Sequence, residues 1–150
     1  RTGTLGRLFS HVEEPLLAPF LTKLKERVAR MRIGDPLDPG TQVGALISQE
    51  HMDKVLTYIE SGKREGAKLM IGGNRVTEGR LGKGCFVEPT VFSGVTDEMK
   101  IAREEIFGPV MNILRFKNID EVIQLIRASE NPAAAREDHL RDGQVLDTRE

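Results

Sequence analysis

Two adjacent carboxylates, an aromatic ring and a Gly-Pro pair lie within seven residues of the sequence, in the segment EEIFGPV that begins at Glu104. Neighbouring side chains point in different directions, so Glu104 and Glu105 make a poor acid/base pair, but one carboxylate aimed inward could accept both hydroxyl protons of a ribose. Phe107 supplies an aromatic face for a planar ring, Gly108 permits close backbone approach, and Pro109 fixes φ. The segment therefore favours ribose-and-ring binding, against the alternative of a solvated Glu pair followed by a core Phe and a turn.

Other residue types that carry chemistry are scattered along the chain. Cys85 is the single cysteine and has no histidine near it in sequence, so we expect a small buried hydrophobe. His11, His51 and His139 are isolated from one another, and their spacing predicts neither a metal site nor a hydrolytic triad. The glycines of GRLGKG, residues 79–84, fit neither phosphate-binding glycine pattern, so the sequence offers no phosphate cradle. From the residues alone, no catalytic residue is assigned.

Two helices are predicted in the first half of the chain. From residue 15 to residue 32 apolar residues recur at spacings of three and four, which is one stripe of a helix. Pro15 and Pro19 are both expected in its first turn, where a missing N–H costs little, and Gly34 is expected to stop it. The second helix has Ser48 as its N-cap and ends near Gly66.

Extended segments alternate with these helices, which indicates the α/β class. Residues 67–71 read as a short strand that a Gly-Gly pair closes. Residues 86–92 read as an edge strand or a bent strand, because Pro89 interrupts them. Residues 111–116 are apolar on both faces, which predicts a buried strand.

The last part of the chain changes in character. Asn118 followed by Glu121 makes a capping-box-like start for a helix from 119 to about 129. The tail beyond it is charged and has only scattered apolar residues, so we expect disorder there.

Composition limits the classes of partner. The chain has 150 residues, 39% of them hydrophobic, which suits one domain with its own core. A net charge of -1 gives no case for nucleic acid or for an acidic lipid surface, and the short apolar runs predict no membrane span. A single cysteine suits a reducing compartment, so we expect a cytoplasmic protein, with a mitochondrial one as the alternative.

Several landmarks in order resemble the NAD(P)-dependent aldehyde dehydrogenase superfamily, and the likeness is colinear from residue 12 to residue 123. They are IGDP (33–36), GALIS (44–48), HMDKVLTYIESGKREGAKLMIGG (51–73), GCFVEPTVF (84–92) and MKIAREEIFGPVMNILRF (99–116). The resemblance implies a partial catalytic domain over 12–123, with helices packed on a mostly parallel sheet. Residues 1–11 and 124–150 are divergent flanking segments.

The resemblance also implies cofactor-binding roles for four residues. Glu105 matches the glutamate that holds the nicotinamide ribose of NAD or NADP, and Phe107 matches the aromatic beside the nicotinamide. Lys54 and His51 match a segment that contributes to the adenosine side of the cofactor, against the alternative of an ordinary exposed helix face.

In that family a cysteine attacks a small aldehyde, and the aldehyde is oxidised and then released as a carboxylic acid. The resemblance would put this cysteine near Thr4, where the sequence has none, and the dinucleotide-binding half is missing as well. We therefore expect a fragment that does not turn over substrate by itself. It could still form a homo-oligomer or a hetero-oligomer. One alternative is a non-catalytic partner of a full-length subunit; another is a small independent nucleotide-binding module.

Overall fold

The computed structural model describes residues 9–118, 120, 121 and 123. The chain divides after Arg115 into two compact units, and the candidate site lies wholly in the first. The elements in chain order are β1 (Phe9–Glu13), α1 (Glu14–Ala29), α2 (Gln49–Arg64), β2 (Lys68–Ile71), the 3-10 helix η1 (Leu81–Lys83), β3 (Thr90–Ser93), α3 (Lys100–Arg103) and β4 (Val110–Phe116).

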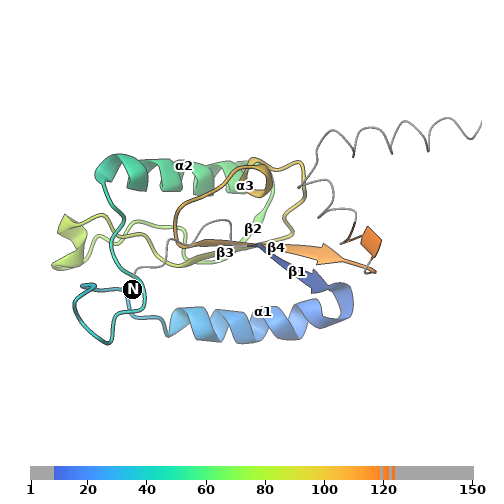
Figure 1. The fold of residues 1–150 in the computed structure, drawn as a ribbon, viewed down its shortest axis with the longest axis horizontal. Coiled ribbons are helices and arrows are strands. Elements are labelled where there is room, and N and C mark those ends of the chain that lie inside the picture. Colours follow the sequence, from blue (N-terminus) through green and yellow to red (C-terminus); the bar gives the residue numbers. More distant parts are fainter. Residues whose placement is uncertain (1–8, 119, 122, 124–150) are drawn as a thin grey trace, which may run out of the picture. The chain divides into compact units, whose positions relative to one another are not determined.

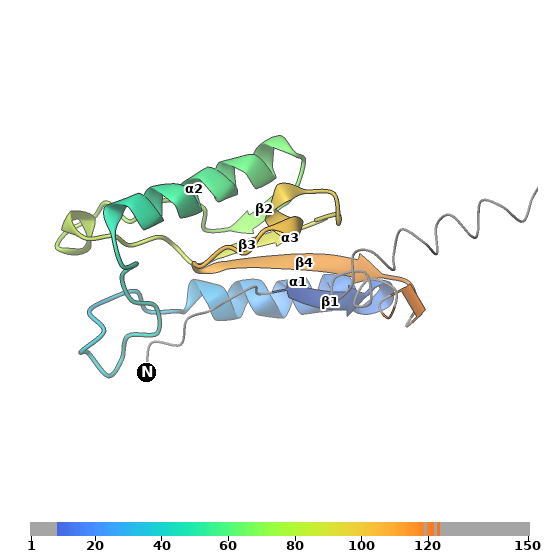
Figure 2. The same ribbon diagram turned by 45° about the horizontal axis from the view of Figure 1, so that its top comes forward.

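The strands form one sheet in the order β1-β4-β3-β2. β3 and β4 run parallel, with Thr90 opposite Val110 and Phe92 opposite Asn112, whereas β2 pairs antiparallel with β3. The arrows of β1 and β4 point the same way in both ribbon views (Figures 1 and 2). The predicted α/β class with helices on a mostly parallel sheet is therefore confirmed.

Helices cover both faces of this sheet, α1 on one side and α2 with α3 on the other (Figures 1 and 2). Successive strand residues point to opposite faces, so Val91 packs toward α1 while its neighbour Phe92 belongs to the larger core beneath α2. In β4, Ile113 likewise packs toward α1, and Leu114 belongs to the larger core beneath α2. The prediction of a buried strand that is apolar on both faces is confirmed.

The predicted helices are present, with shifted ends. Ser48 caps α2 by accepting a hydrogen bond from the backbone N–H of His51 at 3.1 Å, as the sequence predicts. α1 begins at Glu14, so Pro15 does lie in its first turn, but the expectation for Pro19 is wrong. Pro19 lies inside the helix, where it removes the N–H that would donate to the carbonyl of Pro15.

The strand around Pro89 is central, and the prediction of an edge strand is wrong. β3 begins immediately after Pro89 and lies between β2 and β4. The proline therefore stays outside the ladder, where its missing N–H does no harm, and Val87 makes only an isolated bridge with Arg75. β1 was not predicted, and it begins inside the segment expected to be divergent.

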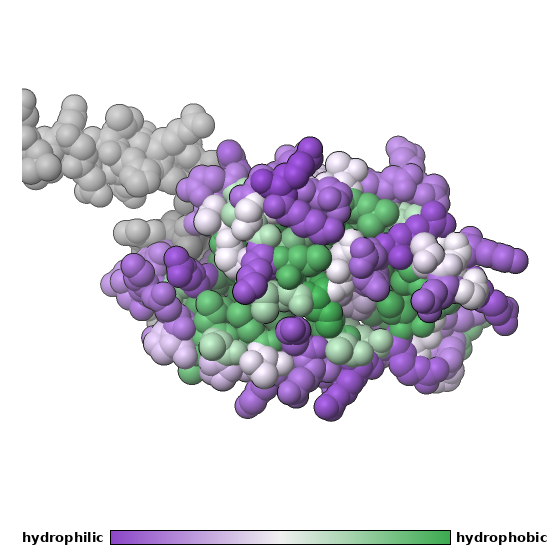
Figure 3. Space-filling view, turned by 180° about the vertical axis from the view of Figure 1, so that it is seen from behind, coloured by the Kyte–Doolittle hydropathy of each residue, from purple (hydrophilic) through white to green (hydrophobic). Residues whose placement is uncertain are grey.

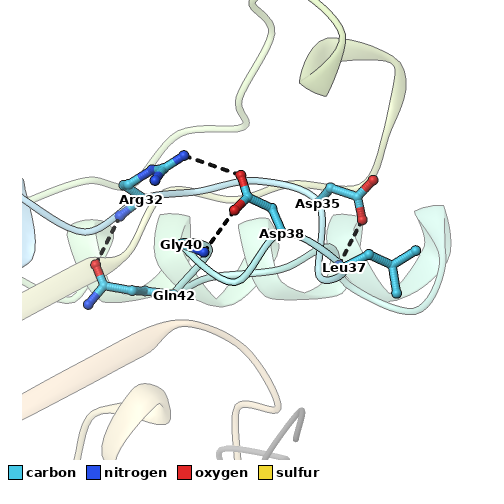
Figure 4. A network of polar contacts seen from close by, with 6 residues as sticks. All are labelled: Arg32, Asp35, Leu37, Asp38, Gly40 and Gln42. Atoms are coloured by element: carbon cyan, nitrogen blue, oxygen red, sulfur yellow. Dashed lines mark hydrogen bonds and ion pairs between the residues drawn. The ribbon is translucent and has the colours of Figure 1, made fainter.

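The connection between α1 and α2 is tied to itself by polar contacts (Figure 4). The guanidinium of Arg32 bonds the carboxylate of Asp38 at 3.2 Å, and that carboxylate also accepts from the backbone N–H of Gly40 at 2.8 Å. Asp35 accepts in the same manner from the backbone N–H of Leu37, at 2.9 Å. The loop is thus held in one shape, with the side chain of Leu37 in solvent.

The second unit begins at Phe116. Its helix start is capped as predicted, because the side-chain oxygen of Asn118 accepts from the backbone N–H of Glu121 at 3.0 Å. The rest of that predicted helix and the tail predicted to be disordered lie outside the described residues. No helix within the described part of the chain is long and apolar enough to cross a membrane.

Candidate functional site

The segment from Lys100 to Gly108 runs along α2 in the opposite direction, and one stripe of the helix holds it. The helix positions in this stripe recur at spacings of four and three, which puts them on one face. The pairs are His51 with Phe107, Val55 with Gly108, Tyr58 with Glu104, Gly62 with Ile101, and the C-cap residue Glu65 with Lys100. The sequence motif EEIFGP is therefore positioned by α2.

At the amino end of α2, a side chain meets the backbone of the motif. Nε2 of His51 contacts the carbonyl oxygen of Phe107. Because a carbonyl can only accept, a hydrogen bond here requires a proton on Nε2 of His51. Ser48 caps the same turn of the helix, so the start of α2 and the loop at Phe107 are fixed together.

Gly108 is required where the loop touches the helix. A Cβ at this position would lie 2.9 Å and 3.0 Å from the two methyl groups of Val55, closer than side chains tolerate. The loop is compact here, since the backbone N–H of Gly108 donates to the carbonyl of Ile106 at 2.9 Å. The close approach that the sequence predicted at Gly108 is thus an approach to α2.

Tyr58 and Glu104 form the central contact. The hydroxyl of Tyr58 donates to Oε2 of Glu104 at 2.7 Å, and the ammonium of Lys100 lies 5.3 Å from the centre of the tyrosine ring. The Tyr58 residue is 9% exposed. The hydrogen bond to Glu104 raises the pKa of Tyr58, and burial and the negative charge of Glu104 raise it further.

At the carboxyl end of α2, Glu65 ties down the start of α3. Its carboxylate accepts from the hydroxyl of Ser61 at 2.5 Å and from the backbone N–H of Lys100 at 2.6 Å. The bond from Ser61 lowers the pKa of Glu65, and the backbone N–H of Lys100 lowers it as well. From the sheet side, the amide of Asn112 donates to the carbonyl of Ile101 at 2.7 Å. Both ends of the segment are therefore anchored.

These anchors determine which side chains of the motif face solvent. Glu104, Glu105 and Phe107 are all exposed, whereas Ile106 is buried in the core beneath α2. The Phe107 residue is 47% exposed, so the alternative of a core Phe is wrong. A carboxylate and an aromatic ring thus lie two residues apart on the outer side of the loop, an arrangement that suits a ribose and the ring attached to it.

Of the other two predicted residues, His51 is brought against Phe107, whereas Lys54 is exposed one helical turn further along α2. The binding roles of all four residues remain predictions. Cys85 packs against the larger core, and its carbonyl accepts from the backbone N–H of Leu46 at 2.7 Å. Tyr58 and Glu65 were missed, although their spacing from His51 on a predicted helix is a signal that could have found them.

A cavity of about 530 Å³ lies at the other end of the segment, lined by Glu65, Glu98, Lys100, Arg103 and Glu104. It is open to solvent and carries charges of both signs. None of the four predicted cofactor residues lines it, so we place the candidate site on the outer side of the loop at Glu105 and Phe107.

The model of the aldehyde dehydrogenase family matches residues 5–135 of this chain. Among solved structures, the HpcC protein from Thermus thermophilus is 46% identical, with a TM-score of 0.73 over 77% of this chain and 23% of that one. An NAD+ complex of aldehyde dehydrogenase from Bacillus cereus is 40% identical, with a TM-score of 0.72 and the same coverage.

A betaine aldehyde dehydrogenase double mutant from Staphylococcus aureus, in complex with NAD+, is 36% identical, with a TM-score of 0.75 over 78% of this chain and 24% of that chain. This chain therefore spans about a quarter of the length of the solved structures it matches.

Proposed function

Since this chain belongs to the aldehyde dehydrogenase family, we propose that its EEIFGP segment holds the nicotinamide and the adjoining ribose of NAD during aldehyde oxidation. The observation that carries the proposal is the paired exposure of Glu105 and Phe107 on a loop that α2 anchors at several points. Two relatives whose structures contain NAD+ support NAD as the cofactor, with NADP as the alternative.

Each residue has a role in binding. The carboxylate of Glu105 would accept the hydroxyl protons of the ribose, and the ring of Phe107 would lie beside the nicotinamide. The contact of His51 with Phe107 supports a place for His51 near this same ribose. Lys54 keeps the role on the adenosine side of the cofactor that the resemblance implies. Bound NAD would accept a hydride from the aldehyde carbon.

The proposed contribution of this chain is cofactor positioning. Cys85 packs against the core and gives no support for a nucleophile at the site, so we expect no aldehyde turnover that depends on it. The acid product and a small aldehyde as substrate belong to the proposal for the whole enzyme.

Saturation-transfer NMR with NAD+ tests the proposal on the 150-residue chain, because this method detects the weak binding expected of half a site. Signal should pass to the nicotinamide and the adjoining ribose more strongly than to the adenine. Glu105→Gln should weaken binding roughly tenfold, because a charged acceptor is lost. The matched control is Glu26→Gln, an exposed residue of α1 on the opposite face of the sheet. Equal binding by both variants would show the assignment of Glu105 to be wrong.

We also propose a second candidate, a non-catalytic partner that docks on a full-length subunit. Figure 3 shows apolar surface bordered by charged side chains on the face seen from behind. Ile47 and Leu37 are 92% and 89% exposed, although the loop that carries Leu37 is well ordered by hydrogen bonds. Co-expression with a full-length subunit tests this function: Leu37→Ser and Ile47→Ser should both reduce co-elution, and an unchanged complex would exclude a docking role for these two side chains.

A further inference from the structure

We propose that Asn112 is a positioning residue, which closes the base of the loop that carries the cofactor-binding motif. The inference rests on the proposed function of that motif, and it begins from a polar side chain in an apolar place. Asn112 lies in β4 and is 3% exposed, one of only four buried polar residues in the described part of the chain. Burying an amide costs free energy unless its polar atoms are hydrogen-bonded.

The two polar atoms of this amide differ. Nδ2 of Asn112 donates to the carbonyl oxygen of Ile101 at 2.7 Å, whereas Oδ1 is buried and has no hydrogen-bond partner among the described residues. Val110 and Leu114, which share this face of β4, belong to the larger core. An apolar side chain would fit such a place without an unsatisfied oxygen. The value of Asn112 therefore lies in the one hydrogen bond that it donates.

The carbonyl of Ile101 needs a donor from outside its own helix. A continuing α-helix would supply the backbone N–H of the residue four positions on, which is Glu105. α3 ends at Arg103, however, and Glu104 is already extended with φ of -107° and ψ of 150°, so the chain leaves the helix before that bond forms. Ile101 is 0% exposed, so solvent does not replace the missing donor. The amide of Asn112 does.

This hydrogen bond joins the two ends of one loop. Ile101 and Asn112 are 11 residues apart, and the motif lies between them with the exposed Phe107 near the middle. The exit of the loop is tied to β3, because the backbone N–H of Thr90 donates to the carbonyl of Pro109 at 2.7 Å. The Asn112 amide ties the entry of the loop to β4. Without it the exit keeps its place, and the entry loses its hydrogen bond to the sheet.

Asn112→Leu separates this role from a general contribution to stability. The substitution removes the unsatisfied oxygen and leaves the Ile101 carbonyl without its donor, so one buried unsatisfied group replaces another. The midpoint of urea denaturation should therefore change little. In hydrogen exchange measured by NMR, the backbone N–H groups of Glu104, Gly108 and Val110 should exchange roughly two- to tenfold faster, whereas those in the middle of α2 should keep their rates.

The second measurement is binding of NAD+ by saturation-transfer NMR. Asn112→Leu should weaken binding roughly two- to tenfold, because the loop that carries Phe107 is held less firmly. Asn74→Leu is the matched control, since Asn74 is exposed, lies outside the loop and donates its amide to the carboxylate of Glu88 at 3.0 Å. It should leave loop exchange and NAD+ binding unchanged. If Asn112→Leu does not fold, Asn112→Ala removes the same donor without added bulk, and loop exchange is compared with α2 exchange in that variant.

The outcomes separate this inference from the proposed function. If the loop of Asn112→Leu exchanges at its original rate, this bond does not close the base and the inference is overturned. If the loop and α2 exchange faster together and the denaturation midpoint falls, Asn112 serves only the stability of the core, which also overturns it. If the loop alone exchanges faster while NAD+ binds as before, and Glu105→Gln loses binding, the proposed function stands and the positioning role fails. If Glu105→Gln binds as well as the unmodified chain, the proposed function fails, and the positioning role fails with it.

Discussion

Gly108→Ala tests whether the site loop is held by direct contact with α2. The added Cβ would lie 2.9 Å and 3.0 Å from the methyl groups of Val55, so the loop or the helix must move by a few tenths of an ångström. Val55 cannot turn away, because a β-branched side chain in a helix has one strongly preferred rotamer. Overpacking destabilises a protein by about 1 to 3 kcal/mol. Replacing Gly by Ala offsets about 0.4 to 1 kcal/mol of this, because it lowers the conformational entropy of the unfolded chain.

We therefore expect Gly108→Ala to lower the free energy of unfolding by about 1 to 2 kcal/mol. Urea denaturation followed by the fluorescence of the single tyrosine measures it, with an unchanged slope against urea expected. NAD+ binding should fall as well, because the displaced loop carries Glu105 and Phe107.

Gly44→Ala is the matched control. Its Cβ would meet only Pro36, at 3.8 Å, which is an ordinary contact, so its stability should stay the same or rise slightly. In the double variant Val55→Ala/Gly108→Ala the clashing methyl groups are gone, and the combined loss should be smaller than the sum of the two single losses. A fully additive double variant, or a Gly108→Ala chain as stable as the original, would refute the claim that this contact positions the loop.

Three further predictions concern stability and use urea denaturation followed by circular dichroism, because one of the variants lacks the single tyrosine. Ser48→Ala removes the cap on His51 and should cost about 1 kcal/mol, whereas Ser48→Asp should keep most of it, and equal losses would exclude capping. Gly72→Ala should cost about 3 kcal/mol or more, because φ is +74° and the Cβ would collide with the carbonyl oxygen of Pro89; Gly94→Ala, with φ of +64° and open space around it, should cost only about 1 kcal/mol. The raised pKa of Tyr58 contributes stability that is complete below pH of about 10 and is lost as pH rises through the folded value, so Tyr58→Phe should flatten the alkaline decline, and an unchanged slope would contradict it.

Local sequence signals predicted the elements whose stabilising contacts are themselves local. Ser48 lies three residues before His51, and its hydrogen bond is made within that turn, so the start of α2 could be predicted from the sequence. The apolar periodicity of residues 15–32 likewise predicted α1, because the stripe that repeats in sequence is the stripe that packs on the sheet.

One error arose where a long-range contact outweighed a local rule. Pro89 suggested an edge strand, but β3 begins one residue later and pairs on both sides. Local preference cannot reveal this, because it depends on which strands lie alongside. Pro19 was expected in the first helical turn, but α1 begins at Glu14, so Pro19 lies in the second turn.

The candidate site divides in the same way. Glu105 and Phe107 belong to a motif that the sequence shows directly, although their exposure had to come from the structure. Tyr58, in contrast, reaches Glu104 across 46 residues of chain. Only the packing of α2 against the motif makes that partner visible.

The stripe of contacts along α2 restricts how many residues α2 can contain in related chains. Each residue added to a helix rotates all later positions by about 100°, so one insertion between His51 and Tyr58 would turn the tyrosine away from Glu104 while the histidine still met Phe107. Substitutions on the outer face of α2 leave this geometry untouched. On that outer face α2 should therefore tolerate changes of residue type, whereas the whole helix should hardly tolerate changes of length, so gaps in this family should fall in the loops that flank it.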